Sequence, residues 1–151
     1  MNVKLSLAEG LNVAGMLLVK LTANGHEGYF ALHTWPDLNI ISEDFVKEID
    51  ANVLRQVTVT SEQGKIRRNI YGMSVSVGDV QIDNNISVGF DSKAFSVIFN
   101  SQHPELKGFL GLGFLRELKA TVDFNKDELT LRFPDRCRKK PAYVMVNQGM
   151  L

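Results

Sequence analysis

Short apolar runs separated by turn residues recur along most of the chain, and this pattern constrains its fold more than any other feature. Residues 54–60, for example, alternate apolar and polar side chains as a strand with one buried face does. Asn24-Gly25 predicts a tight hairpin turn, because this pair tolerates positive φ. Helical spacing of apolar residues is limited to two short segments, residues 45–49 and 114–118. We therefore expect an all-β protein, a barrel or sandwich, with one or two short helices.

The expected strands are defined by their apolar runs. They cover residues 3–7, 13–22, 28–33, 54–60, 65–77, 80–90, 94–99, 120–124, 128–133 and, near the end of the chain, 142–146. Gly10 is expected to end the first strand, and residues 102–107, which include Pro104, are expected to form a loop.

The length and composition predict one folded domain that covers residues 1–151. The 17 basic and 17 acidic residues cancel, so the net charge does not point to nucleic acid, a membrane surface or an acidic substrate. The single cysteine, Cys137, cannot form an internal disulfide, and the first residues lack the apolar run of a signal peptide. No stretch is long and apolar enough to span a bilayer. A cytoplasmic location is therefore expected.

Two stretches carry the most information about function. In the first, an apolar strand over residues 28–32 runs into the turn His33-Thr34-Trp35-Pro36-Asp37 and returns to Ile40-Ile41 before a helix start at Ser42. In the second, Phe109-Leu110-Gly111-Leu112-Gly113 precedes a short helix and a hairpin. Together they resemble the retropepsin-like aspartic peptidases. In that family a strand leads into Asp-Thr-Gly-Ala-Ser, and an apolar-apolar-Gly loop precedes a helix and a hairpin.

The resemblance covers roughly residues 13–133 and implies a closed acid-protease barrel. It places the family's flap hairpin around Gly64. It also implies that Gly111, which has no Cβ, lets one chain segment cross close to the active-site loop. Residues 134–151 then form a basic tail.

The chain departs from the family at the residues that carry the chemistry. His33 stands where the catalytic aspartate is expected and Trp35 where the glycine is expected, while Thr34 keeps the family identity. The family's reaction uses two carboxylates that share a proton, and a pair of imidazoles cannot replace them. Asp37 lies four residues further on, beyond the turn and outside the centre of the cleft. No catalytic residue or metal is therefore assigned, and Trp35, Asp37, Gly64 and Gly111 are expected to line the cleft.

These substitutions predict a catalytically inactive pseudoprotease that serves as a peptide- or protein-binding module or a dimeric scaffold, without a cofactor. Because chains of this family with one triplet dimerise to assemble a site, a homodimer is expected, with residues 3–7 and 142–146 as candidates for the shared sheet. An extended peptide could add as a strand under the Gly64 hairpin. Two alternatives remain open. One is an aspartic-type endopeptidase that acts through another residue, or an inactivated copy of one. The other is a purely structural part of an assembly.

Other clusters of reactive residues have simpler explanations. His26, His33 and His103 lack the spacing of metal ligands. His33, Asp37 and Ser42 lack the nucleophile elbow of a hydrolase, and Ser42 is better explained as a helix cap. The basic cluster at residues 136–140 is interpreted as a solvated tail rather than a nucleic-acid site, because the other charges are balanced.

Overall fold

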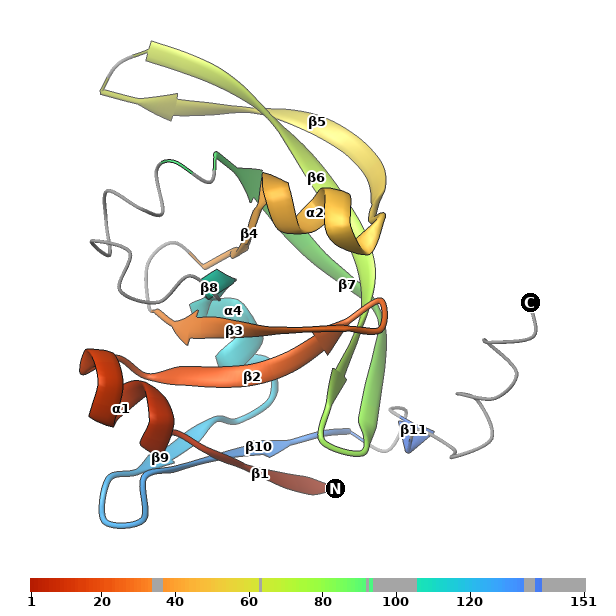
Figure 1. Cartoon of the computed structure of the whole chain (residues 1–151). Helices are drawn as coiled ribbons and strands as arrows, with labels where there is room; N and C mark the ends of the chain where they lie inside the picture. Colours follow the sequence, from red (N-terminus) through yellow and green to blue (C-terminus); the bar gives the residue numbers. More distant parts are fainter. Residues whose placement is uncertain (34–36, 63, 92, 94–105, 135–137, 140–151) are drawn as a thin grey trace.

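Strands dominate the computed structural model, which describes residues 1–33, 37–62, 64–91, 93, 106–134 and 138–139 (Figure 1). The strands are β1 (Asn2–Ser6), β2 (Leu18–Ala23), β3 (His26–Leu32), β4 (Asn39–Ser42), β5 (Asn52–Ser61), β6 (Gly64–Val77), β7 (Val80–Phe90), β8 (Leu106–Leu110), β9 (Thr121–Asp123), β10 (Glu128–Arg132) and β11 (Arg138–Lys139). The helices are α1 (Ala8–Ala14), α2 (Glu43–Ile49) and α4 (Leu112–Glu117). None of the helices in the described part of the chain is long and apolar enough to cross a membrane.

Six strands close into a barrel. Their order is β7-β4-β8-β3-β2-β6, and the pairing of β6 with β7 joins the two ends. The pairs β3–β8 and β4–β7 are parallel, whereas β4–β8, β2–β3, β2–β6 and β6–β7 are antiparallel. This closed barrel, with its few short helices, confirms the fold class expected from the sequence.

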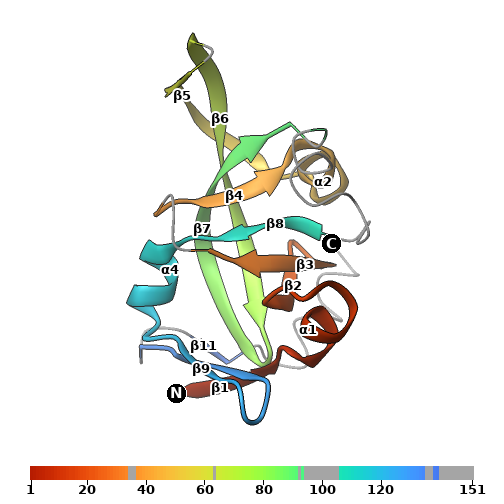
Figure 2. The ribbon, with the colours of Figure 1, turned by 90° about the vertical axis from the view of Figure 1, so that its left-hand side faces the viewer.

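Two further elements extend the barrel. A three-stranded sheet, in the order β1-β10-β9, lies below it in Figure 1. At the opposite end, β5 and the first half of β6 form a long hairpin that projects beyond the barrel, as Figure 2 shows from the side. The hairpin matches the expected strands on either side of Gly64.

One hydrophobic core connects the barrel with the small sheet. Alternate residues of β2 point into it, so that Val19, Leu21 and Ala23 are almost completely buried. Leu129 and Leu131 of β10 are fully buried in the same cluster. Burial of this kind stabilises the packing of the sheet on the barrel by about 25 cal/mol for each Å² of apolar surface removed from water.

The chain before β2 differs from the expectation. The sequence predicts a strand over residues 13–22, but α1 continues to Ala14 and β2 begins only at Leu18. Gly10 does not end a strand; it lies inside α1. A Cβ at Gly10 would lie 2.6 Å from the carbonyl oxygen of Met16 and 2.7 Å from the Cβ of Leu18. Glycine therefore allows the helix to pack directly on the chain that follows it, and apolar content alone did not distinguish this helix from a strand.

Most of the other expected boundaries of strands and helices lie close to the observed ones. β8 begins at Leu106, inside the loop expected over residues 102–107, because it pairs in parallel with β3 from Tyr29 onward. Ser42 is the N-cap residue of α2 with an extended backbone, but its hydroxyl makes no capping hydrogen bond. The expected strands over residues 94–99 and 142–146, together with His103 and Cys137, lie outside the described residues.

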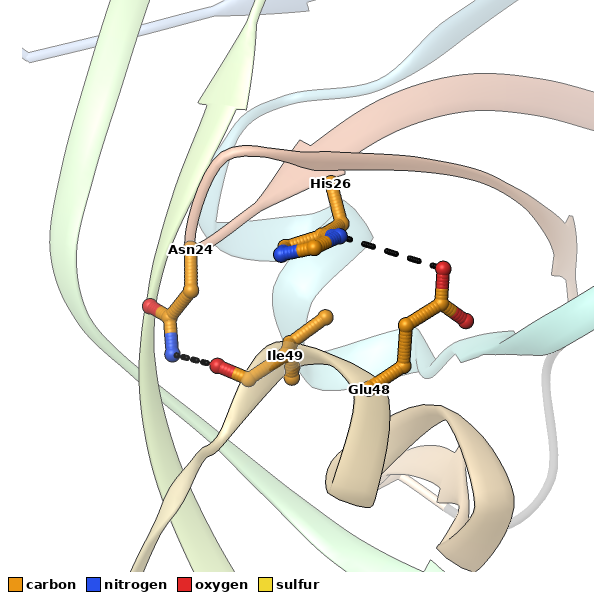
Figure 3. Close-up of polar contacts among 4 residues, drawn as sticks. All are labelled: Asn24, His26, Glu48 and Ile49. Carbon is orange, nitrogen blue, oxygen red and sulfur yellow. Dashed lines mark hydrogen bonds and ion pairs between the residues drawn. The ribbon is translucent and has the colours of Figure 1, made fainter. Parts of the chain in front are cut away.

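The turn between β2 and β3 ties the barrel to α2. Asn24 and Gly25 both have positive φ, 46° and 87°, as the sequence predicts for a tight turn. The Nδ2 of Asn24 donates to the carbonyl oxygen of Ile49 at 3.1 Å, and its Oδ1 accepts from the backbone N–H of Ser74 at 2.9 Å. Beside this contact, the Nδ1 of His26 lies 3.8 Å from a carboxylate oxygen of Glu48 (Figure 3).

The two polar contacts in Figure 3 are expected to differ in strength. Asn24→Ala should lower the free energy of unfolding by about 2 to 3 kcal/mol, because two hydrogen bonds are lost and alanine is disfavoured at positive φ. His26→Ala is the matched control. Both side chains of its ion pair are about half exposed, so its effect should stay below about 0.5 kcal/mol. Urea denaturation measures both values. Equal losses of unfolding free energy would contradict the larger contribution assigned to the hydrogen bonds of Asn24.

Candidate functional site

The polar turn after β3 is held against the segment that follows β8. The backbone N–H of His33 donates to the carbonyl oxygen of Leu110, and the N–H of Gly113 donates to that of Asp37, each at 3.1 Å. The two described ends of the turn are therefore attached to the same stretch, where β8 passes into α4. This arrangement brings together the two sequence stretches on which the resemblance rests.

Gly111 lies at the centre of this contact. A Cβ there would lie 2.2 Å from the carbonyl oxygen of Asp37 and 2.5 Å from that of Leu38. Both distances are far shorter than a van der Waals contact, so only glycine allows the two backbones to come this close. The N–H of Gly111 also donates to the Oδ1 of Asn39 at 2.8 Å. The close crossing expected at Gly111 is present.

His33 follows β3 directly and its side chain packs on the same segment. Its imidazole ring lies 4.9 Å from the ring of Phe109, with the two planes inclined by 44°. Its Nε2 atom is buried. The ring at this position therefore has an aromatic neighbour and a low-dielectric environment.

A hollow of about 760 Å³ opens beside the turn. Its walls come from the end of the turn, the base of the β5–β6 hairpin, β7 and α4. They are formed by Asp37, Leu38, Asn39, Arg55, Ile70, Gln81, Ile82, Asp83, Asn85, Ile86, Val88, Gly113, Phe114, Glu117, Leu118 and Pro134. Two of the apolar side chains, Leu38 and Ile86, are more than half exposed, at 58% and 53%. The hollow thus offers accessible apolar surface of the kind found at binding sites.

The β5–β6 hairpin has two different faces. Arg55 and Ile70 are directly opposite each other on the two strands, and both line the hollow. Because cross-strand partners and every second residue share a face, the pair Val59 and Ile66 lies on this side too. These two side chains are partly exposed near the tip of the hairpin. The pair Val57 and Arg68 lies between them, so the face on the side of the hollow carries four apolar side chains and two arginines.

The opposite face of the hairpin is polar and is bonded to α2. Gln56 donates to the Oδ1 of Asn69 at 3.1 Å, Asn69 donates to the hydroxyl of Tyr71 at 3.1 Å, and Tyr71 donates to a carboxylate oxygen of Glu43 at 2.6 Å. Burial, followed by the hydrogen bond to Glu43, raises the pKa of Tyr71, which keeps the phenol protonated and able to donate. This chain of hydrogen bonds fixes the base of the hairpin relative to the barrel.

The residues expected to line the cleft are distributed unevenly. Asp37 and Gly111 lie against each other beside the hollow, although Asp37 lines it and Gly111 does not. Gly64 is the first residue of β6 at the tip of the hairpin, with φ of 115°. Thr34 and Trp35 lie outside the described residues. Sequence reasoning missed Asn85, whose side chain is more than nine-tenths buried in the wall of the hollow. No motif surrounds it.

Other types of site find no support in the described residues. No three histidine, cysteine, aspartate or glutamate side chains in the described part of the chain are grouped as metal ligands. Ser42 is buried between β4 and α2. Among the described residues, those that meet at the turn include the imidazole of His33, the carboxylate-bearing Asp37, the amide of Asn39 and the backbone amides of Gly111 and Gly113.

Comparison with solved structures identifies the architecture. A retropepsin-like aspartic protease from Rickettsia conorii matches with a TM-score of 0.55 and 14% identity, over 87% of this chain and 88% of that one. The retroviral protease-like domain of Ddi1 from Leishmania major matches with a TM-score of 0.53 and 15% identity, over 83% and 94%. The fold is that of the retropepsin-like aspartic proteases. EIAV protease, in complex with the inhibitor HBY-793, shares the retropepsin-like fold with a TM-score of 0.52 and 12% identity, over 75% and 97%.

No protein-family model and no curated protein sequence matches the chain. At identities of 12 to 15%, the structural matches establish the retropepsin-like fold, and the activity has to be argued from the site itself.

The crossing at Gly111 can be tested by adding a single methyl group. Gly111→Ala should lower the free energy of unfolding by about 3 kcal/mol, because the new Cβ forces two backbones apart. Gly113→Ala is the matched control two residues away. Its Cβ would lie 3.2 Å from the nearest atom, so the cost should be below about 1 kcal/mol. Thermal and urea denaturation measure the difference, and equal stability of the two variants would contradict the crossing.

Proposed function

We propose that the protein is a catalytically inactive retropepsin-like pseudoprotease that binds a peptide or partner protein as a dimeric module. The observation that carries this proposal is the position of His33. It directly follows β3 and is bonded to Leu110, at the place where the resemblance puts the catalytic aspartate. The aromatic contact with Phe109 supports a packing role for this side chain.

The chemistry of the imidazole explains why this substitution removes the reaction. Aspartic proteases activate water between two carboxylates that share one proton, since two like charges about 3 Å apart cannot both ionise. Two imidazoles facing each other would both be protonated in acid and would repel, because the ordinary pKa of histidine is about 6.5. Neither protonation state provides the shared proton and the acceptor oxygens that hold the attacking water.

Binding can persist after catalysis is lost. The hollow and the hairpin face on its side remain, and an extended peptide would lie between the hairpin and β7. In this proposal Asp37, Gly64 and Gly111 shape the cleft, together with Trp35. The bulky indole at residue 35 serves as a plug or an aromatic anchor.

Dimerisation is part of the same proposal. β1 pairs with β10 on one side only, so its other edge in the described sheet is open to a strand from a second copy. Residues 142–146 form the second candidate strand for such a shared sheet.

The loss of catalysis can be measured directly. The wild-type protein should hydrolyse no peptide in a mixed peptide library between pH 3 and pH 7.5, with products followed by mass spectrometry. His33→Asp combined with Trp35→Gly restores the family triplet and is the matched comparison. Cleavage by the wild type that disappears in His33→Ala would refute the proposal and favour an endopeptidase acting through an unusual residue.

The dimer has its own test. Analytical ultracentrifugation at roughly 10 μM should show a dimer, because the open edge of β1 and the tail strand together provide main-chain hydrogen bonds. Removal of residues 140–151 should weaken it, whereas Thr58→Lys, on the polar face of the hairpin, should leave it unchanged. A wild-type monomer under these conditions would contradict the dimer.

A further inference from the structure

A second hollow borders α4 on the face that points away from the first one. Residues 113, 114, 117 and 118 line the first hollow, whereas residues 112, 115, 116 and 119 line the second. This division follows the spacing of three and four residues that defines one face of a helix. The second hollow has a volume of about 430 Å³, and the end of β3, β9 and β10 complete its wall. It is called the α4–β9 hollow below; Figure 2 shows α4 between the barrel and the small sheet.

The wall of the α4–β9 hollow is aliphatic. It is formed by Leu32, Leu112, Leu115, Ala120, Val122 and Leu129. Leu129 is fully buried, whereas the other five side chains are partly exposed. All of these five except Leu112 also pack against the hydrophobic core. The hollow is therefore a place where the apolar interior remains open to water, and covering it would be favourable.

Two cations stand at the rim of this hollow. Arg116 lies at the C-terminal end of α4 and Lys119 lies two residues beyond the helix, and both side chains are exposed. Neither forms an ion pair or a side-chain hydrogen bond with another described residue. No acidic side chain is present in the described part of the lining. A carboxylate at the rim would therefore meet two available cations, and the arginine offers it two parallel N–H donors.

Lys119 occupies a backbone position that favours glycine. Its φ is 48°, in the left-handed region that is costly for a residue with a Cβ and is commonly filled by glycine just after a helix. The N–H of Lys119 donates to the carbonyl oxygen of Arg116 at 3.1 Å, and that of Ala120 donates to Leu115 at 2.9 Å. These bonds fix the turn that carries the ammonium group. A lysine here serves the backbone less well than glycine would, which points to a use for its charge.

We propose that the α4–β9 hollow binds a medium-chain alkyl carboxylate, such as octanoate. The alkyl chain lies on the aliphatic wall, and the carboxylate lies between Arg116 and Lys119. Apart from these two cations, the described lining side chains have no hydrogen-bonding group, so a peptide main chain would find no side-chain partner there. An alkyl chain needs none. This site is separate from the hollow assigned to peptide binding, so the proposal goes beyond that function.

Isothermal titration calorimetry on the full-length chain tests the proposal with ligands that differ in chain length or head group. Octanoate should bind about tenfold more tightly than hexanoate, because each CH2 removed from water tightens binding by up to about fourfold. 1-Octanol keeps the chain but lacks the charge, and it should bind about fivefold more weakly than octanoate, as expected for exposed ion pairs. Octylammonium should bind most weakly.

Four variants assign the binding to this hollow. Arg116→Gln and Lys119→Gly should each weaken octanoate by about threefold and leave 1-octanol unchanged. Lys119→Gly should not lower the melting temperature, because glycine suits the positive φ, so its weaker binding cannot come from unfolding. Lys126→Gln removes one positive charge from the exposed β9–β10 turn and should leave octanoate binding unchanged. Ala120→Leu fills part of the hollow and should weaken both ligands; circular dichroism checks its fold.

The remaining outcomes would overturn the proposal. Equal affinity for octanoate and 1-octanol, or equal weakening by Lys119→Gly and Lys126→Gln, would refute the carboxylate site. Absence of octanoate binding by the folded wild type would refute the site altogether. Self-association that Arg116→Gln weakens would make a second copy the occupant. Binding of an end-blocked peptide of leucine and glutamate, without binding of octanoate, would make an acidic protein segment the occupant. None of these outcomes concerns the first hollow, so the proposed peptide-binding function would stand.

Discussion

Two backbones cross at Gly111 with no room for a side chain between them, and the organisation of the site depends on this crossing. It places the turn that follows β3 directly over the junction of β8 and α4. The parallel pairs β3–β8 and β4–β7 carry these segments into the barrel wall. A side chain at this position would separate the turn from α4, and the hollow between them would lose one of its walls.

The β5–β6 hairpin forms the opposite wall of the hollow, and its two faces make different contacts. One face is bonded through Asn69 and Tyr71 to Glu43 on α2, so the base of the hairpin has a fixed position. The other face presents Ile70 and Arg55 to the hollow. The proposed binding function requires only this rigid frame and an accessible surface, whereas peptide hydrolysis also requires paired carboxylates. The same fold can therefore retain the first capacity without the second.

Much of the fold could be predicted from the sequence because the signals were local. Alternation identified the hairpin strands and Asn24-Gly25 identified a turn. The close crossing at Gly111 was implied by the resemblance of the run around it to the retropepsin-like peptidases. The prediction was wrong before β2, where residues 13 and 14 belong to a helix that packs through Gly10. That packing depends on contact with Met16 and Leu18, which apolar content does not reveal.

The hollow was harder to predict than the turn. Its charged residues, Asp37, Arg55, Asp83 and Glu117, come from four separate elements or loops, and no spacing in the chain relates them. Asn85 is a polar residue of a type that is mostly found at protein surfaces. It becomes buried only when β7 joins β4 and β6. Sites of this type arise from barrel closure, so they become visible only once the strand pairing is known.

The pairing of β1 with β10 has a consequence for how the protein is made. Asn2 is opposite Arg132, and the N-terminal ammonium group donates to the carbonyl oxygen of Phe133. β1 leaves the ribosome well before β10, so its ladder can form only after almost all of the described strands have been made. During synthesis the apolar side chains of β1 and an unpaired strand edge stay exposed, which makes this segment a natural target for chaperones. Such distant contacts also make the closing step of folding slow compared with formation of the local hairpins.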